Sequence, residues 1–163
     1  WDGTLKPGAE KNIIGLEAHL WSETIKGPQM LEYYLLPKLI GFAESAWSKA
    51  RGWETQSDAE IRRQQADQQW NIFANALAKR ELPRLSVLFG GFNYRLPLPG
   101  AIVEEGLLKA NVEYPGLHIR FTTNGEEPTN RSPLYNEPVK VSGEVRLKTF
   151  DAAGKSSRTV IVK

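Results

Sequence analysis

The chain has 163 residues, and its 21 Lys and Arg residues against 19 Asp and Glu residues leave a formal net charge of only +2. Neither sign is concentrated in a block, which argues against a nucleic-acid or anionic-membrane partner. The absence of cysteine excludes disulfides and thiolate metal sites, and no apolar run approaches the roughly 20 residues that a membrane-spanning helix requires.

The N-terminal stretch predicts a loop followed by a buried strand. Residues 1–12 mix Gly, Pro and charged residues without periodicity. Because the first residue is Trp1 rather than Met, we expect the natural N-terminus, with any signal peptide, to be missing. Residues 13–18 then have the length and β-branched content of a buried strand, and only Glu17 interrupts their apolar character.

Trp21 and Glu23 follow this predicted strand and form a candidate substrate-binding pair. If the extended geometry continues, its two-residue period places both side chains on one side of the backbone. An aromatic face beside a carboxylate suits a sugar, whose axial C–H groups stack on the ring while its hydroxyls donate to the carboxylate. On spacing alone, a core Trp and a solvated Glu remain the commoner interpretation.

The next segment predicts helices. Residues 30–47 carry apolar side chains at helical spacing, and Pro28 suits a first helical turn. Pro37 lacks an N–H donor, so the helix either kinks there or is replaced by two short helices. Glu44 is an acid on the apolar face, and it is better explained by a partner such as Arg or a backbone donor than by catalysis.

A second helix is predicted from Ser57, where Ser57-Asp58-Ala59-Glu60 has the form of a capping box. The amphipathic pattern continues to about Arg80 and Leu82-Pro83 ends the helix, with Trp70 and Phe73 expected in the core. Residues 90–100 alternate Pro and Gly with apolar anchors, which indicates a fixed linker.

Beyond the linker the apolar period changes to two. We predict strands at residues 106–112, 117–123, 139–141, 145–150 and 158–163, which together indicate a small antiparallel sandwich. The turns between them are predicted at Pro115-Gly116, Asn124-Gly125, Ser142-Gly143 and Ala153-Gly154. The expected domains are therefore residues 1–99, with the strand, helices and linker, and residues 100–163, the sandwich.

Two stretches of the chain resemble one known family. Residues 15–23, GLEAHLWSE, with residues 37–39 and 43–47 downstream, resemble the last βα unit of the catalytic barrel of glycoside hydrolase family 20, the β-N-acetylhexosaminidases. Residues 119–129 and 132–135 resemble the C-terminal immunoglobulin-like domain of chitobiases and bacterial hexosaminidases. The chain departs from the family pattern at Ile14, His19, Lys38 and residues 124–126, but the two matches occur in the family's order.

The resemblance implies an α+β fold class, in which the terminal strand-helix portion of a (β/α)8 barrel and an extra helix precede an immunoglobulin-like β-sandwich. It implies a parent protein that releases terminal non-reducing N-acetylglucosamine or N-acetylgalactosamine by substrate-assisted retaining catalysis. Trp21 would form a wall of the terminal sugar subsite, and Glu23 would accept hydrogen bonds from distal hydroxyls. The family's catalytic Asp-Glu pair is absent from this sequence, so we expect no catalytic residue here and no activity of the chain alone.

We expect no cofactor and no metal site, because the only two histidines, His19 and His118, lie in different predicted domains without ligand-like spacing. The expected partners are the sugar substrate and the missing N-terminal part of the same protein. We expect residues 1–99 to be ordered only by contact with that missing part or by self-association. The sandwich is expected to fold independently. By resemblance, the location is periplasmic or extracellular in a bacterium.

The alternative function is a non-catalytic carbohydrate-binding or structural β-sandwich module. A binding module requires an exposed aromatic platform on the sandwich. The candidate aromatic residues there are more simply explained as core or edge residues: Tyr114, Phe121, Tyr135 and Phe150.

Overall fold

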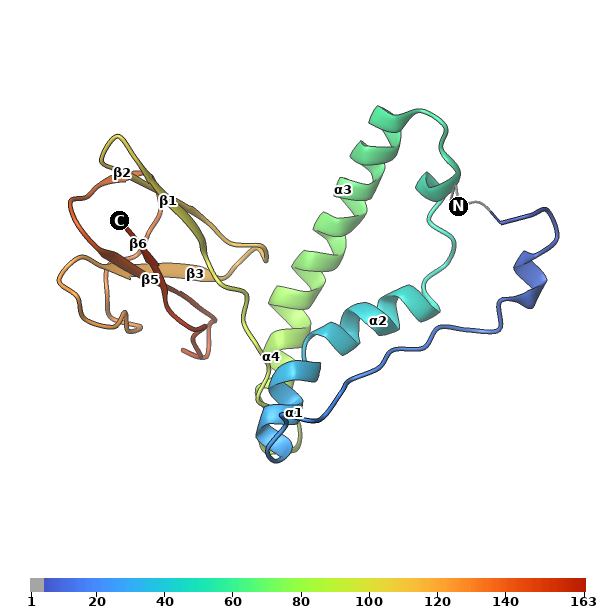
Figure 1. Ribbon diagram of the computed structural model, residues 1–163, viewed down its shortest axis with the longest axis horizontal. Coiled ribbons are helices and arrows are strands. Elements are labelled where there is room, and N and C mark those ends of the chain that lie inside the picture. Colours follow the sequence, from blue (N-terminus) through green and yellow to red (C-terminus); the bar gives the residue numbers. More distant parts are fainter. Residues whose placement is uncertain (1–4) are drawn as a thin grey trace.

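The computed structural model describes residues 5–163, in which a helical part is followed by a β part (Figure 1). An extended segment, residues 91–99, joins the two. The helices are α1 (Pro28–Leu35), α2 (Lys38–Trp47), α3 (Ala59–Ala76) and α4 (Leu82–Leu85). The strands are β1 (Gly100–Glu104), β2 (Leu107–Asn111), β3 (His118–Thr122), β4 (Val139–Lys140), β5 (Val145–Phe150) and β6 (Val160–Val162).

The first helical segment is divided at Pro37, as its sequence predicts. Pro28 lies in the first turn of α1, where its missing N–H has no helical partner to lose. The last hydrogen bond of α1 runs from the Leu36 amide to the Glu32 carbonyl at 2.8 Å, and α2 begins at Lys38. The second of the two predicted alternatives, two short helices, is therefore confirmed.

The predicted start of the next helix at Ser57 is wrong, because Asp58 is the capping residue. Asp58 Oδ1 accepts hydrogen bonds from the amides of Glu60 at 2.9 Å and Ile61 at 3.0 Å, and the helix begins at Ala59. The two amides have no partner within the helix, and a carboxylate at its N-terminus also has a favourable charge.

The predicted end of this helix at Leu82-Pro83 is also wrong. After α3, the residues Leu77–Glu81 form a π-helical turn in which the Leu82 amide donates to the Leu77 carbonyl. This wider turn lets the chain continue into α4, which carries Pro83 in its first turn, where proline is tolerated. The assignment of Trp70 to the core is wrong too, since 45% of that residue is exposed.

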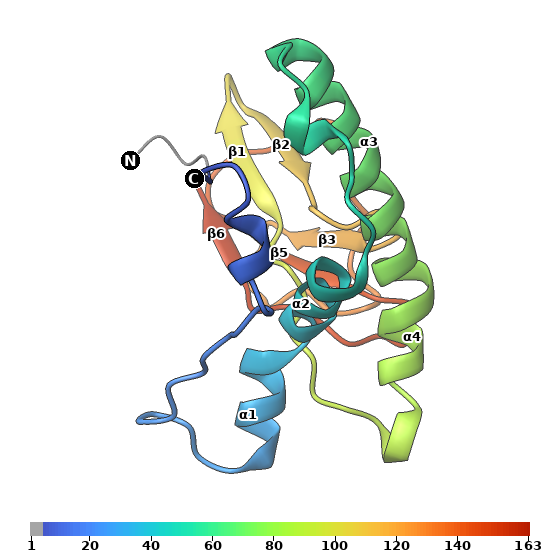
Figure 2. The ribbon, with the colours of Figure 1, turned by 90° about the vertical axis from the view of Figure 1, so that its right-hand side faces the viewer.

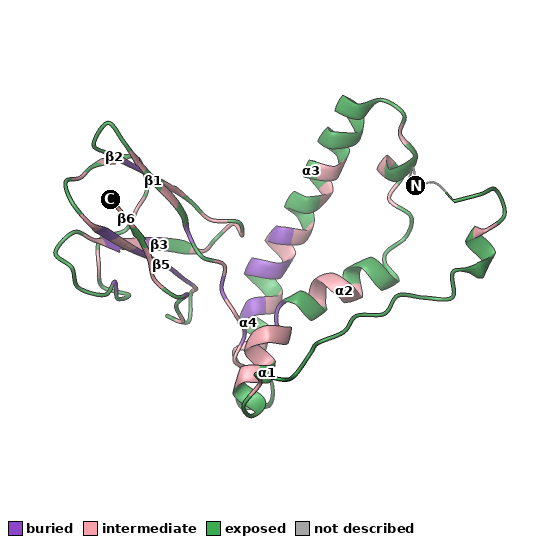
Figure 3. Cartoon of the chain, viewed as in Figure 1, coloured by how far each residue is buried: buried purple, intermediate pink, exposed green. Residues whose placement is uncertain are grey.

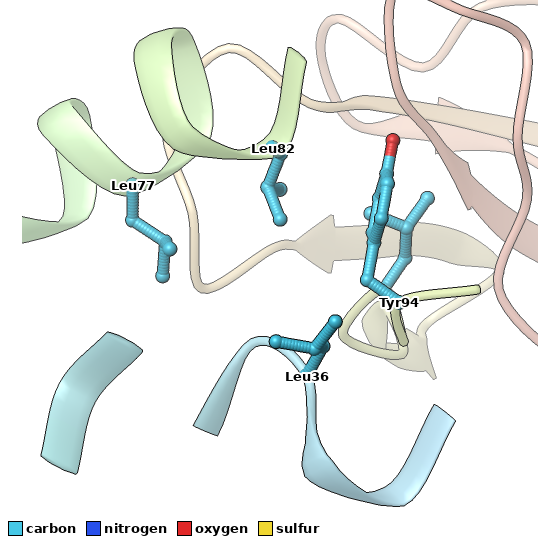
Figure 4. Packing of buried hydrophobic residues seen from close by; sticks show 5 residues of the cluster. Leu36, Leu77, Leu82 and Tyr94 are labelled. Carbon is cyan, nitrogen blue, oxygen red and sulfur yellow. The ribbon is translucent and has the colours of Figure 1, made fainter. Parts of the chain in front are cut away.

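The core of the helical part lies where α1, the π-helical turn, α4 and the extended segment meet. Figure 4 shows Leu36, Leu77, Leu82 and Tyr94 converging there, and Leu96 completes the buried cluster. Phe73 packs against this cluster as predicted, and so do Tyr114 and Leu117 of the β part. The segment predicted to be a fixed linker therefore supplies core residues that are shared by both parts.

The β part contains two three-stranded antiparallel sheets, in the orders β1-β2-β4 and β3-β5-β6. Their buried side chains form a core of their own: Leu108, Ile119, Phe121, Val145 and Leu147. Figure 3 shows buried residues within the strands, among them those of β5. The antiparallel strands β2 to β6 fall within the predicted ranges. This confirms the predicted order, in which helices are followed by a β domain.

The predicted turns of the β part are confirmed, while its first strand was missed. Gly116, Gly125, Gly143 and Gly154 all have positive φ, which glycine adopts without the steric cost of a side chain. No strand was predicted for residues 101–105 at the start of the sandwich domain, although β1 forms a regular hairpin with β2. Glu105 and Gly106, with φ of 51° and 72°, make the turn of that hairpin.

The predicted strand at residues 13–18 does not form. The segment is extended and exposed, and among residues 5–163 no backbone hydrogen bond joins residues 14–21 to another segment. Figure 1 and Figure 2 show it as a coil that leads from a short N-terminal helical turn into α1. A parallel strand is stabilised by neighbours on both edges, and no described strand lies beside this one. The barrel portion of the predicted fold class is therefore not confirmed.

Candidate functional site

Residues 13–22 form an extended segment whose side chains alternate between an apolar side and a polar, aromatic side. Ile14, Leu16 and Leu20 belong to the apolar set, and all three are exposed. On the other side, Glu17 Oε1 lies 3.2 Å from His19 Nε2. The His19 ring in turn stacks on Trp21, with 6.2 Å between centroids and 25° between planes. The two-residue period of extended backbone explains this order.

Trp21 is the most accessible aromatic group of this segment, with 76% of the residue exposed. Since His19 stacks on the indole, the orientation of Trp21 is supported by its neighbour along the strand. An exposed indole offers an apolar face for sugar C–H groups and an N–H donor at its edge. The structure therefore presents Trp21 in a form that a ligand can reach.

Glu23 lies in a turn and not on the extended backbone. The Ile25 amide donates to the Ser22 carbonyl at 3.0 Å, so Glu23 and Thr24 are the central residues of this turn. The alternation that was expected to align Glu23 with Trp21 consequently stops at Ser22. The carboxylate is exposed, and the joint role of Trp21 and Glu23 stays a prediction.

The sequence prediction left Glu17 and His19 out of the site. Glu17 was treated as an interruption of an apolar run, and His19 as a departure from the family pattern. Both lie at two-residue steps before Trp21, so the spacing applied to Glu23 would have grouped these residues with the indole.

A groove of about 850 Å³ lies between α2 and α3, and its floor is largely apolar. Apolar side chains that line it include Ile40, Trp53, Trp70, Ile72 and Phe73. Glu44 is at its rim, with Oε1 3.8 Å from Arg51 Nη2, so the arginine partner expected for this acid is present. The groove and the apolar side of residues 13–22 leave much hydrophobic surface in water, which is typical of a surface that another element covers.

The aromatic residues of the β part are engaged in packing. Phe121 and Phe150 are buried, and the Tyr135 hydroxyl accepts a hydrogen bond from the Ala110 amide at 2.9 Å. The Tyr114 ring lies 6.4 Å from that of Trp70 on α3. These four residues therefore do not build an exposed platform of the kind that a carbohydrate-binding module uses.

Residues 5–163 contain no group of three or more His, Cys, Asp or Glu side chains arranged to hold a metal ion. Within the same range, none of the helices combines the length and the apolar character needed to cross a membrane.

Comparisons with known proteins assign the two parts of the chain separately. Residues 2–50 match the family model for the glycosyl hydrolase family 20 catalytic domain, which includes the exposed segment with Trp21 and Glu23. Residues 81–159 match the model for the chitobiase/beta-hexosaminidase C-terminal domain. The second match begins in the π-helical turn and so includes the extended segment that carries Tyr94.

The relatives point to the same family. An N,N'-diacetylchitobiase of Vibrio harveyi is 36% identical over 163 aligned residues, which cover 94% of this chain and 18% of the relative. A beta-hexosaminidase of Vibrio vulnificus is 29% identical over 170 aligned residues, covering 93% of this chain and 19% of the relative. A beta-hexosaminidase of Porphyromonas gingivalis is 23% identical over 156 aligned residues, which cover 89% of this chain and 18% of the relative.

With both models matched in order, the chain is recognised as a stretch of a glycosyl hydrolase family 20 protein, from the group of chitobiases and β-hexosaminidases. The family is one of glycoside hydrolases, as the resemblance implied. The chain spans less than a fifth of the length of these curated relatives.

Proposed function

We propose that this chain is the part of a β-N-acetylhexosaminidase that forms a wall of the terminal sugar subsite and that also contains the β domain that follows the catalytic domain in sequence. The parent enzyme removes terminal non-reducing N-acetylhexosamine residues, and the substrate's own acetamido oxygen attacks the anomeric carbon. The chain supplies sugar-binding residues, whereas the Asp-Glu pair that promotes the chemistry comes from another part of the enzyme. The observation that carries this proposal is the exposed, His19-supported indole of Trp21 within the region matched to the catalytic domain.

Each residue has a distinct task in this proposal. Trp21 stacks on the apolar face of the terminal sugar and so fixes the plane of its ring. Glu23, on the turn that follows, accepts charge-assisted hydrogen bonds from the distal hydroxyls, which are stronger than neutral ones. His19 keeps the indole in place from the side away from the sugar, and Glu17 lies against the imidazole.

The apolar surfaces of the helical part are, in this proposal, covered by the remaining strands and helices of a family 20 catalytic domain. The extended backbone at residues 14–21 offers unpaired N–H and C=O groups to a neighbouring strand. The groove between α2 and α3 offers an apolar floor with a charged rim to a neighbouring helix. The coverage of less than a fifth of the relatives supports this occupant over a small ligand.

A chimera tests the proposal. Residues 5–163 replace the aligned segment of the Vibrio harveyi N,N'-diacetylchitobiase, and hydrolysis of p-nitrophenyl N-acetylglucosaminide is measured. The chimera should be active, and Trp21→Ala should lower kcat/KM by roughly fivefold or more, because a stacking contact of an aromatic ring stabilises by about 1 kcal/mol or more.

Phe89→Ala is the control, since Phe89 is 94% exposed and lies outside both the region matched to the catalytic domain and the lining of the groove between α2 and α3. This variant should change kcat/KM far less than Trp21→Ala. An inactive but folded chimera, or equal losses in the two variants, would refute the proposed role of Trp21.

A further inference from the structure

Polar residues at the junction of the two parts form a continuous chain of hydrogen bonds. In the β part, Asp151 accepts from the Lys155 amide at 2.9 Å through Oδ1 and from the Tyr94 hydroxyl at 2.5 Å through Oδ2. The Lys155 ammonium lies 4.3 Å from the centroid of the Tyr94 ring and donates to Asn93 Oδ1 at 2.9 Å. Burial lowers the pKa of Lys155, and the carboxylates of Asp151 and Glu32 oppose that shift.

Asn93 connects this chain to α1. Its Nδ2 donates to the Gln29 carbonyl, in the first turn of α1, at 2.9 Å, and its backbone amide donates to Glu32 Oε2 at 2.7 Å. The orientation of the side-chain amide is determined by its partners, because an ammonium can only donate and a carbonyl can only accept. The oxygen and the nitrogen of the Asn93 side-chain amide therefore bridge Lys155 and the first turn of α1.

The first turn of α1 is in turn connected to the candidate site by a short, bonded stretch. The Leu31 amide donates to the Gly27 carbonyl at 3.2 Å, and the Lys26 amide lies 3.3 Å from Met30 Sδ. The turn from Ser22 to Ile25, with Glu23 at its centre, directly precedes this stretch. Only a few residues, held by these local bonds, therefore separate α1 from Glu23 and Trp21.

We propose that Asn93 is a positioning residue through which the β part holds α1, and with it the turn from Ser22 to Ile25 that carries Glu23, in place. The β domain then has a function besides its own stability, because it supports, through α1, the turn that carries Glu23. The consequence for sugar binding rests on the function proposed above, whereas the mechanical link does not.

Hydrogen exchange measured by mass spectrometry on the whole chain tests the link. Lys155→Met removes the donor from the β part without touching α1, and peptides covering residues 24–36 should exchange about tenfold faster, as expected for the loss of a half-buried charged hydrogen bond. Peptides covering β3 and β5 should be unchanged. Asn93→Ala should give the same pattern, and the double variant should add little, because both changes break one bridge.

Lys155→Arg should restore much of the protection, since a guanidinium can donate to Asn93 Oδ1. Asn71→Ala, an exposed asparagine on α3, is the matched control and should leave exchange unchanged. Unchanged exchange of residues 24–36 in Lys155→Met would overturn the proposal. So would a uniform increase throughout the chain, because that would show only a general loss of stability.

Discussion

The Tyr94 hydroxyl donates to Asp151 Oδ2 at 2.5 Å, across 57 positions of sequence and from the helical core to the loop between β5 and β6. Figure 4 shows this hydroxyl at the end of the side chain away from Leu36, so the ring packs in the core while its tip reaches the β part. Burial raises the pKa of Tyr94, and Asp151 adds to that shift. The hydroxyl is therefore protonated at neutral pH and serves as a donor.

We expect Tyr94→Phe to destabilise the chain by about 1 to 3 kcal/mol, because the variant keeps the buried ring but leaves the Asp151 carboxylate without its donor. Thermal unfolding followed by circular dichroism measures this loss. Tyr34→Phe, on α1, is the control and should change the midpoint much less. Equal midpoints for Tyr94→Phe and the unmodified chain would contradict the importance of this bond.

The cap of α3 supports a second prediction, with a matched pair of neighbouring residues. Asp58→Ala should destabilise the helical part by about 1 kcal/mol, since two amides lose their acceptor. Ser57→Ala should have little effect, because Ser57 lies outside the cap. Urea unfolding of the two variants separates them, and a larger loss in Ser57→Ala would restore the capping box predicted from the sequence.

Local signals in this sequence predicted local structure well. Pro37 divides the helices because a proline in a helix interior removes a backbone hydrogen bond and clashes with the preceding turn. The glycines at positions 116, 125, 143 and 154 occupy turns because their positive φ is set within a few residues. The choice between Ser57 and Asp58 as cap was not predictable in this way, since both residue types cap helices and the first-turn geometry decides between them.

Features that depend on distant parts of the chain were not predictable from local patterns. The segment with Tyr94 and Leu96 looks like a linker, but its burial depends on Leu82 and on the β part. The run at residues 13–18 has the composition of a strand, yet pairing requires neighbours that the described chain lacks. For the site, the resemblance singled out Trp21, whereas the stacking of His19 on it required the structure.

A third prediction concerns acid stability, through Glu127. Its carboxylate accepts from Lys148 at 2.9 Å, from Thr159, and from Arg146 at 3.1 Å. These partners, Lys148 foremost, lower the pKa of Glu127 from 4.5 to about 2. Because the pKa in the folded chain is below its unfolded value, the stabilisation is complete above about pH 4.5 and is lost as the pH falls toward 2.

Glu127→Gln should therefore make the urea midpoint less dependent on pH between about 4.5 and 2. Glu137→Gln removes another exposed carboxylate of the β part and should keep the original dependence. Added salt should weaken the effect, since the group is at the surface. An unchanged pH dependence in Glu127→Gln would show that its hydrogen bonds do not affect stability.

The chain alone should be catalytically inert, which is the fourth prediction. Its sequence contains no Asp-Glu dipeptide to provide the proton donor and the acetamide-orienting residue. A complete barrel also requires on the order of 250 residues. Purified chain should release no p-nitrophenol from p-nitrophenyl N-acetylglucosaminide, and measurable turnover that survives repurification would show that the chain holds its own catalytic groups.

The last prediction concerns the backbone of residues 14–21, which has no hydrogen-bonded partner among residues 5–163. Their amides should exchange in dilute, monomeric chain at nearly the rate of an unfolded peptide, because no ladder or burial protects them. The amides of β5, which pairs with both β3 and β6, should be strongly protected under the same conditions. In the active chimera with the Vibrio harveyi relative, residues 14–21 should become protected as well, because barrel strands would then flank them on both edges. Strong protection already in the monomer would show that the segment needs no such neighbours, and its assignment to a barrel strand would fail.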